Sequence, residues 1–435
     1  MVKSKNRNLK FCELTEKEFS SFASNKEQSS YMQTIEISEL RKVYGSKIFL
    51  AGMKENNKIV AGAMISITNT MFGKKSFYSP RGYILDYSDY DLLKEFTEKL
   101  SDYAKKNNAL FIKIDPNVIY QLRDSNANLY EDQIKNDEII LNLKRLGYHH
   151  YGFNKDFEFT QCRWNYRLKL DVPYDELKKG FSKSTRKNIE STYKKGIKVR
   201  IATRNDLNSM QEILNATGER KNFNFKSIDY FTNLYDKMGD LLRIYIAYIE
   251  PINYLNCCEK MLAEAEKEYE DIQLKMKKDM IGTKLKNQEI SAKNKIEKLK
   301  EELKVAKDFK KKYPNGKDIG VLVSLKSGLE YLTLYSGYLV EFKYFTPKYA
   351  MYNEHILDAY KFNMKYANFY GISGVFDPKD KNYGMYEFKK GFGGEVVELI
   401  GEFSYPVSKL YYIYNIIHKA KILLKKLKQK FGGKI

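Results

Sequence analysis

The amino-acid sequence predicts an α/β protein built from two similar modules, with an antiparallel pair of helices inserted into the second module. Three observations lead to this prediction. Strand-like and helix-like segments alternate between residues 47 and 116, the same order of segments returns from residue 318, and two helices with apolar residues at heptad spacing lie between residues 255 and 306. The length of 435 residues also favours two domains of roughly 150 to 200 residues each with an appendage.

The first module is predicted to span residues 1–165. Its strands are short runs of apolar and β-branched residues bounded by turn-forming residues. The apolar run at residues 59–67 has the length of a strand and is far shorter than the roughly 20 residues that a membrane-spanning helix needs. We expect strands at residues 48–52, 59–67, 76–80 and 110–115, and a helix at residues 92–106.

The second module repeats this order, with strands expected at residues 319–326, 330–337 and 368–373 and a helix at residues 349–366. The spacing also repeats, because Tyr78 precedes Ile112 by 34 residues and Tyr335 precedes Tyr370 by 35 residues. Chance similarity of two generic α/β units is the alternative explanation. We assign residues 166–251 and 314–408 to this module.

The second module begins with two helices predicted between residues 172 and 193. Pro173 suits a first helical turn, and Ser182 or Ser184 can cap the second helix. The outer face of these helices is basic, which favours contact with an anionic partner, although a solvated helix face is the simpler explanation. Its cations are Lys178, Lys179, Lys183, Arg186, Lys187, Lys194 and Lys195.

The inserted arm is predicted to span residues 252–313. Its apolar residues alternate at spacings of three and four, which is the a/d pattern of a coiled coil, and a break near residues 278–283 separates the two helices. Strands expected at residues 241–249 and 319–325 flank the arm, so it should replace a strand-to-strand turn and project from the sheet edge. Oligomerisation is the alternative role. The two seams are Leu255, Cys258, Leu262, Ala265, Tyr269, Ile272 and Met276, and Leu285, Ala292, Ile296, Leu299, Leu303 and Ala306.

The C-terminal segment, residues 409–435, contains eight lysines and no acidic residue, interleaved with apolar residues. A basic amphipathic helix of this kind can lie on an anionic bilayer surface. It could equally cap the second module and carry solvated lysines.

The composition bounds the partners and the compartment. The 76 Lys and Arg against 55 Asp and Glu give a net charge of +21, which leaves nucleic acid, anionic lipid and a phosphorylated substrate as candidates. The four cysteines form no CxxC pair, which suits a reducing compartment, and the four histidines show no metal-binding spacing, so we expect no metal. The N-terminus lacks the apolar stretch of a secretory signal, and we expect a cytoplasmic protein.

Several catalytic motifs are absent from the sequence. It contains no nucleophile elbow, Walker loop or GxGxxG, which argues against hydrolase, NTPase and dinucleotide chemistry. The paired modules resemble the GNAT acyltransferase fold. Residues 81–90, however, lack the glycine-rich loop with which GNAT enzymes hold the pyrophosphate of acetyl-CoA, so a different acyl donor is implied.

Six short motifs, in order along nearly the whole chain, resemble those of the FemABX family. The resemblance implies an aminoacyltransferase without a cofactor that moves an amino acid from aminoacyl-tRNA to the stem peptide of lipid II or of UDP-MurNAc-pentapeptide. We also expect a monomer or weak dimer, and the basic C-terminal segment would allow it to associate with the inner face of the membrane. The motifs are SPRG at 79–82 with Asp86-Tyr87, IDP at 114–116, GERKNFNFKSIDYF at 218–231, YSG at 335–337, EFKKGFGG at 387–394 and IGEFSYPV at 400–407.

The resemblance also implies roles for particular residues. The proposed base falls at Asp115 and the lysine near the reacting carbonyl at Lys389. The phosphate contacts fall at Arg41, with Lys42 beside it, and at Lys226, where Arg and Lys are interchanged relative to the family pattern, so that the charge is kept but the geometry differs. The substrate-contacting tyrosines fall at Tyr230 and Tyr335.

These residue types suit aminoacyl transfer, because the ester of aminoacyl-tRNA is already activated. The enzyme must align an amine, give its proton a route and stabilise an oxyanion. Asp115 is the candidate for the proton, with a substrate carboxylate as the alternative, and Lys389 for the oxyanion. Without a role in catalysis or binding, Asp115 would be a turn residue, Lys389 a solvated lysine and Tyr335 a core residue.

The tRNA contact is expected to involve two regions. The arm resembles the tRNA-binding arm of seryl-tRNA synthetase, but residues 255–312 hold 16 Lys against 12 Asp and Glu, a modest net charge of +4. We therefore also expect contacts from Lys183, Arg186, Lys187, Lys194 and Lys195. The competing functions are a GNAT-type N-acyltransferase with another acyl donor, and a non-catalytic tRNA- or membrane-binding protein, which would leave Asp115 and Lys389 without purpose.

Overall fold

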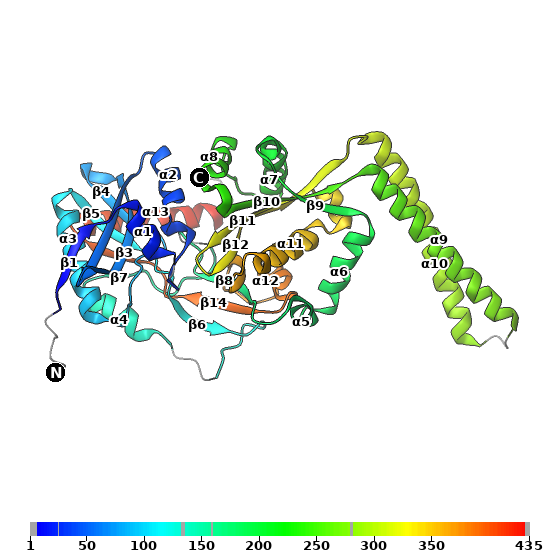
Figure 1. The fold of residues 1–435 in the computed structure, drawn as a ribbon, viewed down its shortest axis with the longest axis horizontal. Helices are drawn as coiled ribbons and strands as arrows, with labels where there is room; N and C mark the ends of the chain where they lie inside the picture. Colours follow the sequence, from blue (N-terminus) through cyan, green and yellow to red (C-terminus); the bar gives the residue numbers. More distant parts are fainter. Residues whose placement is uncertain (1–6, 25, 132–134, 158–159, 279–281, 431–435) are drawn as a thin grey trace.

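The computed structural model describes residues 7–24, 26–131, 135–157, 160–278 and 282–430. Within these ranges the strands form one sheet of seven strands and one of eight, and a pair of long helices projects from the second sheet (Figure 1). The predicted architecture, two α/β modules with an inserted antiparallel helical arm, is confirmed.

The first sheet has the strand order β1-β2-β3-β4-β5-β15-β7. β4 and β5 are parallel, as the connection through α3 (Tyr90–Lys106) allows, and the other neighbours are antiparallel. The strands are β1 (Leu9–Glu13), β2 (Lys47–Glu55), β3 (Lys58–Asn69), β4 (Lys75–Ser79), β5 (Ala109–Ile114), β15 (Phe403–Pro406) and β7 (His149–His150).

The second sheet has the order β6-β14-β8-β13-β12-β11-β10-β9. Its parallel pair, β12 and β13, is joined by α11 (Pro347–Lys361) as β4 and β5 are joined by α3. Tyr335 pairs with Val323 as Tyr78 pairs with Ser66, so the sequence repeat is a structural repeat. The strands are β6 (Ile119–Arg123), β14 (Glu395–Leu399), β8 (Trp164–Lys169), β13 (Tyr366–Ile372), β12 (Glu330–Tyr338), β11 (Lys317–Ser327), β10 (Leu242–Ile249) and β9 (Ile197–Ile201).

Each sheet contains one strand from the part of the chain that was assigned to the other module. The predicted boundaries at residues 165 and 408 therefore do not coincide with the division between the sheets. β6 lies in the predicted first module but pairs with β14 at the edge of the second sheet. β15 lies in the predicted second module but is inserted between β5 and β7 of the first sheet. A local hydrophobic pattern identifies a strand but not the strand with which it pairs. The exchange of β6 and β15 between the sheets could therefore not be predicted from the sequence.

The remaining helices cover the sheets, with α1 (Glu16–Ala23), α2 (Ile35–Val43), α4 (Asp137–Arg145), α7 (Leu207–Lys221), α8 (Ile228–Met238) and α12 (Tyr383–Lys390). The two predicted basic helices are α5 (Tyr174–Lys179) and α6 (Lys183–Lys194), and Ser182 caps α6 by accepting a hydrogen bond of 3.1 Å from the N–H of Thr185. The helix predicted for residues 349–366 ends earlier, at Lys361, because Asn363 adopts a positive φ of 54° before β13 begins.

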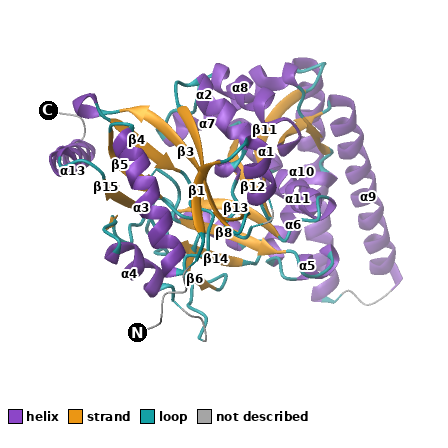
Figure 2. Ribbon diagram, turned by 60° about the vertical axis from the view of Figure 1, so that its left-hand side comes forward, coloured by secondary structure: helices purple, strands orange, loops and turns teal. Residues whose placement is uncertain are grey.

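The arm consists of α9 (Pro251–Lys278) and α10 (Thr283–Lys312), which run antiparallel between β10 and β11 (Figure 2). Lys295 of α10 forms an ion pair of 2.7 Å with Glu268 of α9, and the seam residues Ala265 and Ala292 are buried. The prediction that the arm leaves from the sheet edge is wrong. β9 lies outside β10, so β10 is an interior strand of the sheet. The centre of the predicted break, residues 279–281, lies outside the described residues.

The C-terminal helix α13 (Leu410–Lys430) packs against the first sheet, not against the second module as the capping alternative had it. Tyr411 is buried, and its ring lies 5.9 Å from that of Phe111 on β5. In Figure 2 this helix lies at the opposite end of the molecule from the arm. No helix in the described ranges has both the length and the apolar character required to cross a bilayer.

One buried cluster joins the two modules. It contains Phe19 and Leu40 from α1 and α2 together with Tyr331 and Phe369 from the second sheet. The face of the first sheet that carries α1 and α2 is therefore turned toward the second module, and the candidate site lies along this junction.

Candidate active site

Asp115 directly follows β5 and is almost completely buried. One carboxylate oxygen, Oδ2, accepts a hydrogen bond of 2.7 Å from the Tyr78 hydroxyl, and Oδ1 accepts one from the backbone N–H of Arg81. Burial raises the pKa of Asp115, while the charge of Arg81 and the two hydrogen bonds oppose the shift. The carboxylate is thus held in one orientation, and the raised pKa makes it a stronger base than a solvated aspartate.

Arg81 lies in the same region as Asp115. It is buried, has a positive φ of 57°, and donates through Nη2 to the carbonyl oxygen of Cys162 at 2.7 Å. Its charge acts on both Asp115 and Tyr370. No role for Arg81 followed from the sequence, although an arginine between a proline and a glycine at a strand end is a signal that could have indicated it.

Lys389 lies on α12 and is 4% exposed. Its Nζ donates to the carbonyl oxygens of Tyr370 (3.1 Å) and Gly371 (2.6 Å) on β13. Burial lowers the pKa of Lys389 to about 7, because the charged form is desolvated. The lysine is thus not a solvated surface residue, and it can gain or lose a proton near neutral pH.

Tyr370 and Tyr31 are two further tyrosines of this region. The Tyr370 hydroxyl donates to Gln161 at 3.0 Å, and burial raises the pKa of Tyr370 to about 12. Tyr31 is buried and interacts electrostatically with Tyr370 and Arg81, and its burial also raises its pKa. Neither tyrosine was predicted as a site residue, because an aromatic side chain in an apolar pattern is usually core.

Arg41 lines a pocket of about 200 Å³ on the first sheet. Its Nη1 donates to the Ser66 hydroxyl at 3.2 Å, whereas its buried Nε has no hydrogen-bond partner among the described residues. Tyr78 lines the same pocket and links it to Asp115. Lys42, its predicted companion, is exposed instead and forms ion pairs with Glu39 and Glu16.

The pocket is rich in hydroxyl groups and has two cations, which suits an anionic ligand. The second cation, Lys113, donates to Thr160 at 2.7 Å and pairs with Glu402 at 3.1 Å, so its charge is partly compensated. Arg41 therefore supplies most of the free positive charge. The lining side chains also include Ser46, Ser66, Thr68, Ser76, Phe111 and Tyr414.

Tyr230 and Tyr335 lie together where α8 approaches α2. Burial raises the pKa of both, and the charge of Arg41 acts on Tyr230, so the pair belongs to the same region as the pocket. The Tyr335 ring packs against Phe231 at 5.3 Å, which makes it partly a core residue. Lys226 is exposed, with Nζ 5.6 Å from the centre of the Tyr230 ring.

A sequence model of the FemAB family matches residues 14–419. The chain belongs to the FemAB family. It is 30% identical to the aminoacyltransferase FemB of Staphylococcus epidermidis over 429 residues, covering 96% of this chain and all of that one. It is 28% identical to the aminoacyltransferase FemA of the same species over 417 residues, covering 95% and 100%. The crystal structure of FemX matches with a TM-score of 0.74 at 25% identity, over 91% of this chain and 97% of that one.

The basic helix α6 of this FemAB-family chain presents only part of its predicted cations to solvent. Lys183, Lys187 and Lys194 are exposed. Arg186 donates to the carbonyl oxygen of Lys179 at 2.7 Å. Lys195, which follows the helix, has a structural role, because its Nζ donates to the Tyr344 carbonyl and lies 3.4 Å from the centre of that ring.

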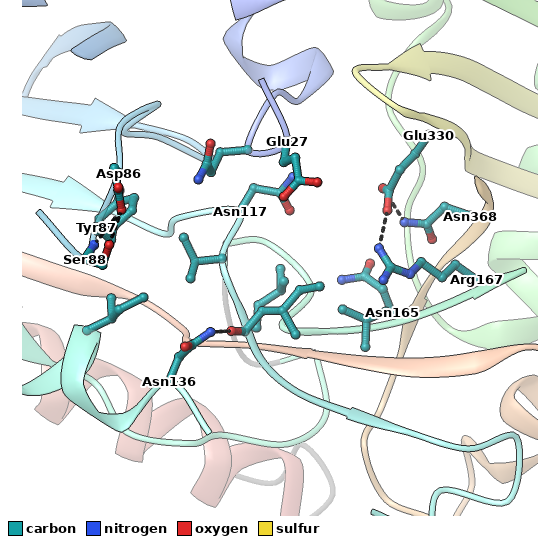
Figure 3. A pocket seen from close by; sticks show the side chains of 16 residues that line it. Glu27, Asp86, Tyr87, Ser88, Asn117, Asn136, Asn165, Arg167, Glu330 and Asn368 are labelled. Atoms are coloured by element: carbon teal, nitrogen blue, oxygen red, sulfur yellow. Dashed lines mark hydrogen bonds and ion pairs between the residues drawn. The ribbon is translucent and has the colours of Figure 1, made fainter. Parts of the chain in front are cut away.

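A larger cavity of about 350 Å³ lies at the junction, with Asn117 and Asn165 in its lining, and none of the predicted site residues lines it (Figure 3). Its most buried ionic group is Arg167, which pairs with Glu330 at 3.3 Å; Asn368 also donates to Glu330, at 2.7 Å. The polar groups of this cavity thus pair with one another, whereas Nε of Arg41 in the smaller pocket has no hydrogen-bond partner among the described residues.

Proposed function

We propose that this FemAB-family protein transfers an amino acid from aminoacyl-tRNA to the stem-peptide amine of a peptidoglycan precursor and so builds the interpeptide bridge. One observation carries the proposal. Asp115 from the first module and Lys389 from the second are both buried. Asp115 accepts a hydrogen bond from Arg81, Lys389 donates one to Tyr370, and the charge of Arg81 acts on both Asp115 and Tyr370. A carboxylate and a lysine with a pKa near 7 at one junction suit acyl transfer between two substrates that are bound in different modules.

The acceptor amine is mostly protonated near neutral pH, so its nitrogen loses two protons in the reaction, one to a base before the attack and one as the amide forms. The amine nitrogen attacks the ester carbonyl carbon, a C–N bond forms, and the C–O bond to the ribose breaks as the tRNA 3′-oxygen leaves with a proton. A lysine-like amine has an ordinary pKa of about 10.4, so a base is needed near neutral pH. Asp115 is oriented for this role by Tyr78 and by the Arg81 N–H.

Lys389 is the candidate for stabilising the oxyanion. A charged lysine has three N–H donors, and two of them are engaged by the carbonyl oxygens of Tyr370 and Gly371. The third remains for the developing negative charge on the substrate oxygen. With a pKa of about 7, Nζ can also return a proton to the leaving 3′-oxygen.

The acceptor is proposed to place a phosphate in the Arg41 pocket. The pocket of about 200 Å³ admits phosphate groups but not a whole precursor, so the stem peptide must extend from it toward Asp115, along Tyr78. Tyr230 and Tyr335 remain neutral hydrogen-bonding groups because burial raises the pKa of each. Lys226 lies beside Tyr230, exposed to solvent, where it can follow a bound anion.

The experiment supplies the protein with tRNA charged separately with Ala, Ser and Gly, together with lipid II or UDP-MurNAc-pentapeptide. Mass spectrometry of the precursor should show one added aminoacyl residue with at least one donor and one acceptor. Transfer from an acyl thioester with none from any charged tRNA would refute the proposal.

The exposed face of α13 supports a further part of the proposal, peripheral binding to the cytoplasmic side of an anionic membrane. Tyr411 and Tyr414 face the first sheet, and Tyr414 lines the Arg41 pocket. Among the side chains that the structure describes, four large exposed apolar ones lie on the opposite face, and the basic sequence around them matches an anionic surface. These four are Tyr412, Ile413, Ile416 and Leu424, which are 62%, 50%, 70% and 58% exposed.

Vesicle sedimentation tests this part. The double substitution Ile413→Ser and Ile416→Ser should weaken binding to phosphatidylglycerol vesicles at least tenfold, because it removes apolar surface from the bilayer contact. Ile252→Ser with Val305→Ser, at equally exposed positions on the arm, is the matched control. Equal binding of the two double variants would refute α13 as the membrane contact.

A further inference from the structure

Glu402 is a buried carboxylate that the proposed mechanism does not use. It belongs to the IGEFSYPV motif, directly precedes β15, and is 6% exposed. Its carbonyl oxygen accepts a hydrogen bond of 3.1 Å from the N–H of Tyr151, and its Oε1 accepts one of 3.0 Å from the N–H of Thr160. Both donors are backbone groups, so the position of this carboxylate does not depend on a mobile side chain.

The register of the first sheet places Glu402 beside Asp115. β15 and β5 are antiparallel and Phe403 pairs with Ile114, so the residue before Phe403 lies opposite the residue after Ile114. Directly opposite residues of an antiparallel pair project from the same face of the sheet. Burial is the main cause of the raised pKa of Asp115, and the charge of Glu402 adds to it. The second carboxylate thus makes the first a stronger base.

Lys113 compensates the charge of Glu402. Its Nζ lies 3.1 Å from Oε2 of Glu402 and donates to the Thr160 hydroxyl at 2.7 Å. Lys113 and Thr160 both line the Arg41 pocket and Glu402 does not, so the two residues separate this carboxylate from the pocket. The ion pair therefore connects the pocket to the neighbour of the proposed base.

Apart from Tyr78, the other groups that act on Asp115 lie outside the pocket. The charge and the backbone N–H of Arg81 lower the pKa of Asp115, as does the hydrogen bond from Tyr78. Tyr87 and Tyr370 interact with Asp115 electrostatically, and both are neutral because burial raises the pKa of each. An anion in the pocket leaves the contacts of Arg81, Tyr87 and Tyr370 in place.

Such an anion competes with Glu402 for Lys113. A phosphate group carries up to about two negative charges and several accepting oxygens, whereas the carboxylate carries one charge. A lysine has a flexible stem and N–H donors that can rotate, so its amine can turn from Glu402 toward a phosphate that Arg41 also attracts. Glu402 then keeps its hydrogen bond from Thr160 but loses its counter-ion.

We propose that Glu402 and Lys113 couple the Arg41 pocket to the base: a bound phosphate draws Lys113 away from Glu402, and the uncompensated Glu402 makes Asp115 a stronger base. Glu402 is then a positioning residue that acts through Asp115. This inference rests on the proposed function, which supplies the acceptor phosphate and the role of Asp115. Its consequence is that the base reaches full strength only when the acceptor is bound, which limits hydrolysis of the charged tRNA in the absence of an acceptor.

Anion affinity provides a test that needs no turnover. Calorimetric titration of the full chain with pyrophosphate at pH 7 should show at least about threefold tighter binding to Glu402→Gln than to the unmodified protein, because Lys113 is no longer held by a carboxylate. A variant that merely damages the fold would bind more weakly. Glu395→Gln is the matched control, since Glu395 pairs with Arg167 at 2.7 Å in the second sheet, and it should leave the affinity unchanged. Equal or weaker binding by Glu402→Gln would overturn the inference.

A second measurement reads the pKa of Asp115 from the carboxyl ¹³C resonance that disappears in Asp115→Asn. Saturating pyrophosphate, with ionic strength matched by chloride, should raise this pKa by about 0.5 or more in the unmodified protein. In Glu402→Gln the pKa should start lower and respond at most half as much. An equal response in the two proteins would contradict the coupling, since the anion would then act on Asp115 directly. So would the absence of a response in unmodified protein that binds pyrophosphate.

Variants of Lys113 test the other member of the pair. Lys113→Met should raise the pKa of Asp115 without pyrophosphate, whereas Lys113→Arg keeps the charge and should not. In the Glu402→Gln background, Lys113→Met should change this pKa at most half as much, because the charge that Lys113 compensates is absent. Lys54→Met is the matched control, since Lys54 is 27% exposed against 22% for Lys113 and pairs with Glu18 at 2.6 Å. Equal changes in the two backgrounds would overturn the inference.

The outcomes separate this inference from the proposed function. If the unmodified protein transfers an amino acid from charged tRNA but Glu402→Gln binds pyrophosphate no more tightly, only the inference fails. If the unmodified protein uses no charged tRNA, the proposed function fails, while the affinity and the titration still decide the coupling. If pyrophosphate does not bind the unmodified protein, the proposed phosphate site and the inference fail together.

Discussion

Replacing Lys389 with methionine should remove a pH dependence from the stability of the fold. Burial lowers the pKa of this lysine from an ordinary value of 10.5 to about 7. Between these values the unfolded chain keeps a proton that the folded chain has released. Raising the pH therefore favours the folded state of the unmodified protein. Methionine has a similar length and no titratable group, so the variant lacks this term.

The size of the effect follows from the two pKa values. If Lys389 is the only group whose pKa shifts, the shift costs about 4 kcal/mol of folding free energy at pH 7 and about 2 kcal/mol at pH 9. The methionine variant also leaves the carbonyl oxygens of Tyr370 and Gly371 without their donor, which costs about 1 to 3 kcal/mol for each unpartnered group. That cost does not vary with pH to first order. The stability of the unmodified protein relative to the variant should therefore rise by about 2 kcal/mol from pH 7 to pH 9.

Urea unfolding at pH 7, 8 and 9 and constant ionic strength measures this difference. Lys379→Met is the control, because Lys379 is exposed on the loop that precedes α12. A constant difference between the unmodified protein and Lys389→Met across this pH range would refute the reasoning. The same pH dependence in the Lys379→Met comparison would also refute it.

Further predictions concern activity. Lys389→Ala should lower transfer at least tenfold in a folded protein, since it removes the donor proposed for the oxyanion; full activity in single-turnover assays would contradict that role. Asp115→Asn keeps an acceptor for the Arg81 N–H, so the fold should persist, and its loss of activity should grow from pH 9 to pH 7 as more of the amine is protonated; a constant activity ratio to the unmodified protein would argue against Asp115 as the base. Arg41→Ala should raise the acceptor KM at least fivefold and leave the KM for charged tRNA unchanged; the reverse pattern would reassign the pocket. Replacing residues 267–299 of the arm with a short Gly/Ser linker keeps the packed base of the arm around Phe309. This variant should have a higher KM for charged tRNA, and that KM should depend less on salt. An unchanged KM, together with conversion of a dimer to a monomer in sedimentation, would instead make the arm a dimerisation device.

Local patterns in the sequence predicted the elements well. Both faces of β11 are buried, so most residues between Ile319 and Leu325 are apolar, with Ser324 as the exception. The heptad seam of α9 and α10 is visible because each helix buries one stripe against the other. The repeat was recognisable because β4 and β12 end in similar tyrosine-containing segments at the same position of each module.

The pairing of distant segments was not predictable in the same way. β6 and β15 each have an ordinary strand pattern, and nothing within them specifies the sheet that they join. A role for Lys389 was expected only from the family resemblance, and its burial was not predicted, since lysine is a surface residue in most contexts. Arg81 became visible as a site residue only when β5, the segment after β4 and Cys162 were brought together by the fold.

The exchange of β6 and β15 limits how the two modules can move. Many two-domain enzymes close over their substrates by rotating about a single linker. Here the chain crosses between the two sheets after β5, after β7 and after β14, so a rotation of one sheet against the other would have to bend all of these crossing segments together. The several crossings therefore restrict how far the Arg41 pocket can move relative to Lys389. Exclusion of water from the reacting ester must then come from the substrates themselves and from side chains such as Tyr31 and Tyr370, rather than from a closing domain.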